Sequence, residues 1–146
     1  MESIRVKKDD VYRIEVNDDG EYIEFDLLDI ELPSKCLKAS KELKKQHSIY
    51  NQKKIALQRQ YKNNRELLFT KIHEADMEYC NRMRKSFDTF LGEDACQKIF
   101  GSANRIGMFD DLFEQLQPHF EKMEINIEKV KEKIIEKYAK KDEGII

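Results

Sequence analysis

Three cysteines and three histidines are the residues of this chain that could bind a metal ion or supply a nucleophile and its base. They are widely spaced, and the sequence contains neither a CxxC nor an HxxxH pair. Because structural zinc sites draw their ligands from such clustered pairs, the spacing argues against a metal centre. We therefore expect buried thiols and surface imidazoles at Cys36, Cys80, Cys96, His47, His73 and His119.

Nucleophilic catalysis would need a thiol beside a base, and Cys96 with His119 is the pair that can be imagined. Cys96 lies in the segment FLGEDACQKIFG, where it shares a predicted helical face with Ile99 and Phe100. That position is typical of a small core residue. The glycines form neither a GxGxxG motif nor a P-loop, so phosphate binding is not indicated. We predict no catalytic residue, no cofactor, no metal and no enzyme activity.

The charges are unevenly distributed along the chain. Residues 1–32 carry 4 basic and 11 acidic side chains, whereas residues 33–62 carry 9 basic and 1 acidic. The basic block could follow a phosphate backbone, as in a nucleic-acid-binding regulator using residues 35–62. Against this, the isoelectric point is near 6.0, and in the block only Tyr50 and Tyr61 could stack on bases. We interpret the block as a solvated face that pairs with acidic segments of the same or another copy.

The composition indicates one domain, residues 1–146, rich in solvated helix. Charged residues make up 38% of the chain, well above the ~25% of ordinary globular domains. No apolar run is long enough to span a membrane, and the first residues do not resemble a secretory signal. Three separate cysteines fit a reducing cytoplasm.

The N-terminal region, residues 1–31, is predicted to form a β-hairpin. Apolar and charged residues alternate along 12–16 and again along 23–27, with NDDG between them. These four residues, Asn17–Gly20, are suited to a tight turn, and Gly20 is the expected position with positive φ. Ile4 and Val6 could add a short third strand.

Residues 32–91 are predicted to be helical, because apolar positions recur at spacings of three and four. Pro33 suits a first helical turn. The segment YKNNREL contains two weak helix formers, Asn63 and Asn64, and is the expected break. One long kinked helix is the alternative, but we favour two antiparallel helices that end at Gly92.

Residues 92–146 are predicted to contain three further helices. A short helix over EDACQKIFG presents Ala95, Cys96, Ile99 and Phe100 on one side, so we interpret this segment as architecture. A second follows over MFDDLFEQLQPHFEKM, where Pro118 is expected to kink or break it. A final helix is expected to pack Ile127, Val130, Ile134 and Tyr138, before a frayed tail. The predicted fold class is therefore α+β, mostly α.

An aromatic stripe in this last region is a large apolar load for a small chain. We interpret it as core, or in part as a partner-binding surface. Phe113 and Phe120, seven residues apart, would be the strongest anchors for a partner helix. The candidate partner-binding residues are Phe100, Phe109, Phe113, Leu116 and Phe120.

The order of these segments resembles a known family. The hairpin IEVNDDGEYIEFDLLDIELP, the charged helices, FDTFLGEDACQKIFG, MFDDLFEQLQPHFEKM and the closing Glu/Lys-rich helix together look like the small tail proteins of siphophages and prophages of Firmicutes, described as tail assembly chaperone-like. The resemblance spans nearly the whole chain, and FLGEDACQKIFG and FDDLFEQLQPHF are its most specific parts.

The resemblance implies a non-enzymatic tail assembly protein. It implies binding to the tape-measure or tail-tube protein in the cytoplasm of a bacterial host, and it brings no catalytic residues. A structural virion component that oligomerises is the alternative. We also expect self-association, because the hairpin face and the aromatic stripe exceed what one thin helical body would bury.

Overall fold

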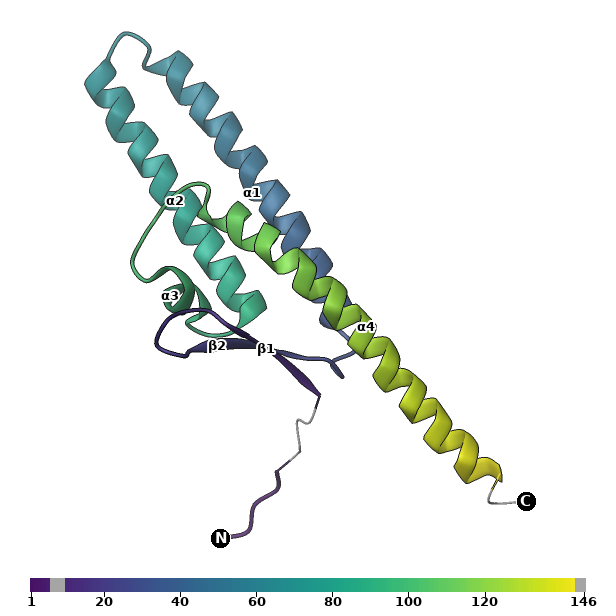
Figure 1. Ribbon diagram of the computed structural model, residues 1–146. Coiled ribbons are helices and arrows are strands. Elements are labelled where there is room, and N and C mark those ends of the chain that lie inside the picture. Colours follow the sequence, from purple (N-terminus) through teal and green to yellow (C-terminus); the bar gives the residue numbers. More distant parts are fainter. Residues whose placement is uncertain (6–9, 144–146) are drawn as a thin grey trace.

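The computed structural model describes residues 1–5 and 10–143, and these form an α+β fold that is 67% helical (Figure 1). An N-terminal hairpin precedes the long helices, as predicted. The elements in chain order are β1 (Val11–Glu15), β2 (Tyr22–Asp26), α1 (Leu32–Gln60), α2 (Arg65–Leu91), α3 (Ala95–Phe100) and α4 (Met108–Glu143).

The hairpin pairs β1 with β2 antiparallel, in a register that sets Ile14 opposite Ile23. The turn is the predicted one: Gly20 has φ +80°, and the Asn17 side chain accepts hydrogen bonds from the backbone N–H groups of Asp19 and Glu21. The apolar face is buried at Ile23, Phe25 and Leu27. Ile4 lies in no strand, and Val6 lies outside the described residues. The described sheet therefore has two strands, not three.

The long helical region divides into two antiparallel helices, α1 and α2, at the predicted break. Pro33 occupies the first turn of α1, and Asn64 caps α2 by accepting a hydrogen bond from the Leu67 N–H at 3.1 Å. An Asn at this position satisfies one of the free donors of a helix start. The weak helix former therefore ends one helix and starts the next.

The segment around α3 turns the chain across the base of α2. Gly92 ends α2 at φ +118°, a conformation that side-chain-bearing residues rarely adopt. The Asp88 carboxylate then accepts a hydrogen bond from the Cys96 N–H at 2.8 Å, which fixes the start of α3. Ala95 and Cys96 are buried, and Ile99 and Phe100 pack against the core. The segment is architecture, as the sequence indicated.

Helix α4 differs from the prediction, because it runs unbroken from Met108 to Glu143 with Pro118 inside it. A proline in a helix interior costs about 3 kcal/mol. The Pro118 ring lies on the exposed side, while Leu116 and Met123 on either side of it are both 2% exposed. Burial of these side chains offsets the lost backbone hydrogen bond. The side chains predicted to pack farther along, from Ile127 to Tyr138, lie outside the described ones, as do residues 144–146.

The core is one cluster to which every element contributes, and Phe109 lies at its centre. This ring is fully buried. Its centroid lies 5.7 Å from that of Phe87, 6.2 Å from Tyr79 and 5.5 Å from Phe100. Rings from α2, α3 and α4 thus meet at a single point.

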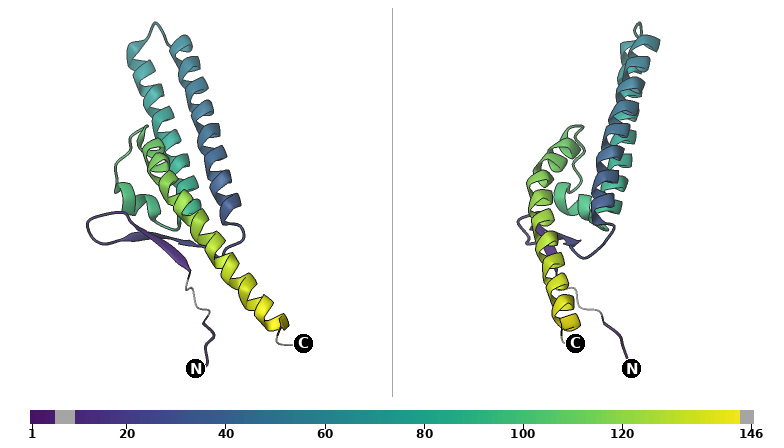
Figure 2. Two further views of the ribbon diagram at one scale, coloured as in Figure 1. Left: turned by 45° about the vertical axis from the view of Figure 1, so that its right-hand side comes forward. Right: turned by 90° about the vertical axis from the view of Figure 1, so that its right-hand side faces the viewer.

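The elongated shape follows from where α4 joins the helical hairpin. Its N-terminal half lies against α1 and α2, near the middle of α2 (Figures 1 and 2). Beyond this section α1 and α2 continue as a pair to their connecting turn, and α4 continues alone in the opposite direction. We call these two projections the arm (residues 48–76) and the rod (residues 124–143).

Replacing Phe109 with alanine should lower the free energy of unfolding by about 3–5 kcal/mol, because the change opens a cavity where three other rings meet. The matched control is Phe69→Ala, which removes a ring that is 77% exposed and should change stability by less than about 0.5 kcal/mol. Urea unfolding at low protein concentration measures both. Equal losses in the two variants would contradict the assignment of Phe109 to the core.

Candidate binding groove

The five predicted partner-binding residues lie in or against the core. Phe109 and Leu116 are 0% and 2% exposed, so neither presents a surface in the isolated chain. Phe100, Phe113 and Phe120 are half-buried and pack against the core. Phe113 and Phe120 do share a face, with ring centroids 6.0 Å apart. A partner could therefore reach only the half-buried members of the set.

The cysteines lie in environments that hold them as neutral thiols. Burial and the nearby Asp88 raise the pKa of the Cys96 thiol to about 12. Burial also raises the pKa values of Cys36 and Cys80. Because the thiolate is the nucleophilic form, these thiols are poorly reactive at neutral pH.

Two histidines take part in contacts that tie helices to their neighbours. Nε2 of His47 lies 2.7 and 2.9 Å from the carboxylate oxygens of Asp110, and 3.2 Å from the Tyr79 hydroxyl. Nδ1 of His119 lies 2.8 Å from the Tyr12 hydroxyl. The first contact joins α1, α2 and α4, and the second joins the hairpin to α4. Among the described residues, no three His, Cys, Asp or Glu side chains form a group that could hold a metal ion.

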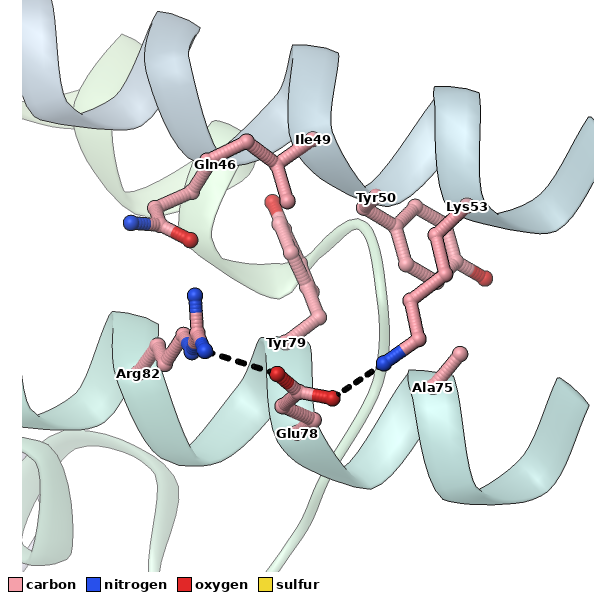
Figure 3. A pocket seen from close by; sticks show the side chains of 8 residues that line it. All are labelled: Gln46, Ile49, Tyr50, Lys53, Ala75, Glu78, Tyr79 and Arg82. Atoms are coloured by element: carbon pink, nitrogen blue, oxygen red, sulfur yellow. Dashed lines mark hydrogen bonds and ion pairs between the residues drawn. The ribbon is translucent and has the colours of Figure 1, made fainter. Parts of the chain in front are cut away.

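A small pocket between α1 and α2 is closed by an ion pair (Figure 3). Glu78 lies between Lys53 at 2.5 Å and Arg82 at 2.7 Å, so one carboxylate joins the two helices. These cations hold the pKa of Glu78 below its usual range. The cavity of about 20 Å³ has room for one water molecule. It is a gap in helix packing and is too small for a ligand.

A larger groove lies where the first turns of α1 face the last turns of α2. It encloses about 580 Å³. Its floor includes Phe90 and Ala39, and three lysines stand around it. We call it the base groove, lined by Glu31, Ser34, Lys35, Lys38, Ala39, Glu42, Lys85, Ser86, Thr89 and Phe90.

The chemistry of the base groove suits an amphipathic partner with carboxylates. Lys35 is bound to Asp29 at 2.7 Å, and this hydrogen bond raises the pKa of the lysine. Lys38 and Lys85 add two further cations to the lining. The Phe90 ring is anchored from behind by Phe25 and Phe120, at centroid distances of 5.9 and 6.1 Å. A fixed aromatic floor edged by lysines can accept an apolar side chain and an acidic neighbour together.

The groove could be found only in part from the sequence. The basic block that begins at Lys35 was visible as a row on one helix. Phe90 was assigned to the same apolar stripe as Phe87, and nothing in the spacing separates a fully buried ring from one that lines a groove. Which lysines face Phe90 depends on how α1 and α2 pair, which is a tertiary property.

The match of the chain to a protein family extends over the whole region just described. The model of a family of unknown function, DUF6673, matches residues 19–143. The chain belongs to this family. The matched part runs from the hairpin turn to the end of α4, so it includes the core, the arm and the base groove. No curated protein and no solved structure matches the chain significantly.

The membrane question has a simple structural answer for the described part of the chain. None of its helices combines the length and the apolar character that crossing a bilayer requires.

The environments of the thiols predict their reaction with a disulfide reagent at pH 8. Cys80 and Cys96, which are 2% and 1% exposed, should react at least tenfold more slowly than half-buried Cys36, since they are buried as well as neutral. All three should react at one rate in denaturant. Measuring the kinetics on single-cysteine variants assigns each phase. Fast reaction of Cys96 in the folded protein would contradict its placement.

The tyrosines at the contact between α1 and α2 predict a loss of stability at high pH. Burial raises the pKa of Tyr79 to about 12, and burial with a hydrogen bond to Asp76 raises that of Tyr50. An unfolded tyrosine ionises near pH 10. The stabilisation is therefore complete below pH 10 and is lost as the pH rises from 10 to 12.

Urea unfolding at pH 9, 10 and 11 should therefore show a falling free energy of unfolding. Tyr79→Phe should make this fall shallower, by an amount on the order of 1–2 kcal/mol over the range. Tyr61→Phe is the matched control and should leave the slope unchanged. An unchanged slope in Tyr79→Phe would show that Tyr79 ionises normally in the folded chain.

Proposed function

We propose that this protein is a non-enzymatic phage tail assembly protein that binds a helical segment of the tape-measure or tail-tube protein. The resemblance of its segments to tail assembly chaperone-like proteins supplies the biological context. The observation that carries the proposal is the base groove, in which an apolar floor at Phe90 is edged by Lys35, Lys38 and Lys85. An amphipathic helix with acidic flanks would place apolar side chains on the floor and carboxylates beside the lysines.

The physical reason for such a protein lies in its client. A long helical protein that must wait for its partners exposes apolar stripes, and exposed stripes aggregate. A groove that covers one stripe reversibly would keep the client available until assembly begins. On this proposal the protein acts in the cytoplasm of the bacterial host and leaves before the particle is complete.

A structural tail component is the second candidate, and the shape of the molecule favours it. The arm and the rod project from opposite ends of the body (Figure 2), as expected of a subunit that contacts neighbours on two sides. A nucleic-acid-binding regulator has less support. Two lysines of the basic block, Lys35 and Lys53, already pair with Asp29 and Glu78.

The test is binding of the purified full chain to the tape-measure protein and to the tail-tube protein encoded in the same genome. The double variant Lys38→Glu, Lys85→Glu reverses two cations of the base groove and should weaken binding by roughly tenfold or more. Lys41→Glu, Lys44→Glu makes the same change in net charge at exposed positions of α1 that do not line the groove, and should bind as the wild type does.

The outcomes separate the candidates. Wild-type binding to neither protein, or equal binding by the groove variant, would overturn the proposal. Presence of the protein in purified particles would favour the structural candidate. Tight binding to duplex DNA with a steep dependence on salt would favour the regulator.

A further inference from the structure

The two ends of this molecule are unequal in a complementary way. At one end, the arm consists of two helices without a third, and at the other end the rod is a single helix (Figures 1 and 2). Between them, the N-terminal half of α4 completes a three-helix section with α1 and α2. The arm therefore lacks a third helix of the kind that the rod could supply.

The arm carries forward the face on which α4 packs. Phe69 is 77% exposed and precedes Phe87 by 18 residues, which is five helical turns. Phe69 therefore lies on the same side of α2 as Phe87, whose ring stacks on Phe109. Ile72 and Phe90 are related by the same interval. The face that α4 covers lower on α2 thus continues up the arm with an exposed aromatic ring.

The sequence of the rod repeats the half of α4 that is buried. Positions 127, 130 and 134 hold Ile, Val and Ile, and each follows Phe109, Leu112 or Leu116 by 18 residues. Those three earlier residues are 0%, 9% and 2% exposed. Met123 is the last buried residue known in α4, and the described rod side chains are all exposed: Glu124, Glu132, Ile135, Glu136, Lys137 and Ala139.

The charges follow the same interval. Asp110 of α4 contacts His47 of α1, and Glu128 and Glu132 follow Asp110 and Glu114 by 18 residues. This side of the rod sequence is acidic where the contact side of α4 is acidic. The facing end of the arm, residues 53–65, carries 5 basic and no acidic side chains. Charge complementarity therefore favours the rod of a second copy on the arm.

The lengths are compatible. The rod has 20 residues beyond Met123, about 30 Å of helix at 1.5 Å per residue. The open part of α2, from Arg65 to Asp76, is about 18 Å long on the same scale. One rod can cover the whole arm.

We propose that the rod of one copy docks on the arm of the next, next to Phe69, and extends the three-helix section from molecule to molecule. Such a head-to-tail contact uses two different surfaces and closes into a ring or grows as a filament. It goes beyond the proposed function, because the base groove takes no part in it.

The test is sedimentation velocity of the full chain over a range of concentrations. Phe69→Glu alters the arm, and Ile134→Glu alters the rod; each alone should remain monomeric where the wild type associates. Leu67→Glu is the matched control, since two residues turn the helix by about 200° and place Leu67 on the opposite side of α2. It should associate as the wild type does, and circular dichroism confirms that each variant is folded.

Mixing the two variants decides the geometry. The intact rod of the Phe69→Glu copy can dock on the intact arm of the Ile134→Glu copy, so the mixture should form 1:1 dimers and nothing larger. A monomeric wild type, or association of Phe69→Glu like that of the wild type, would overturn the proposal. A mixture without dimers would overturn it too, because it indicates symmetric pairing.

The outcome is independent of client binding. Phe69→Glu leaves the base groove intact and should still bind the tail client if the proposed function holds. Loss of association with client binding retained supports this inference and the proposed function together. Association without any client binding contradicts the proposed function alone.

Discussion

The burial of Phe109 is the interaction on which the rest of the structure depends. Its ring contacts α2 through Tyr79 and Phe87, and α3 through Phe100. Without this contact α4 would lose its main attachment, and α3 would lose the ring that holds it across the base. The hairpin depends on it indirectly, because Phe25 packs on Phe120 of the same helix. A chain with 38% charged residues has little other apolar area, so one central cluster must hold all elements together.

A small core also explains why so much helix lies outside it. The cluster can bury only a few turns of each helix, and α1, α2 and α4 are all longer than that. What projects is available for contacts with other molecules, both at the arm and at the rod. The polar groups within the body are used for structure: His47 joins three helices, and Glu78 joins two. The protein is thus organised for binding, with its chemistry at surfaces and between helices.

Local features were predictable because they depend on near neighbours in the sequence. Alternation along 11–27 specified the hairpin, and Asn64 and Gly92 marked helix ends that the structure confirms. The break at Pro118 was wrong, because the cost of one missing hydrogen bond is local while the burial that offsets it, at Leu116 and Met123, is tertiary. The central role of Phe109 among the aromatic residues had no local signal either. The base groove required knowing that Lys38 and Phe90 come from helices that lie side by side.

Native-state hydrogen exchange tests the central claim most directly, namely that one cluster around Phe109 supports two projecting ends that pair between copies. At low concentration, amides of α2 near Phe87 and of α4 near Phe109 should exchange slowest, by global unfolding, while those of the arm and the rod exchange much faster. Raising the concentration should slow exchange in the arm and the rod together and leave the central amides unchanged. Arm and rod amides as protected as the centre at low concentration, or insensitive to concentration, would contradict the account.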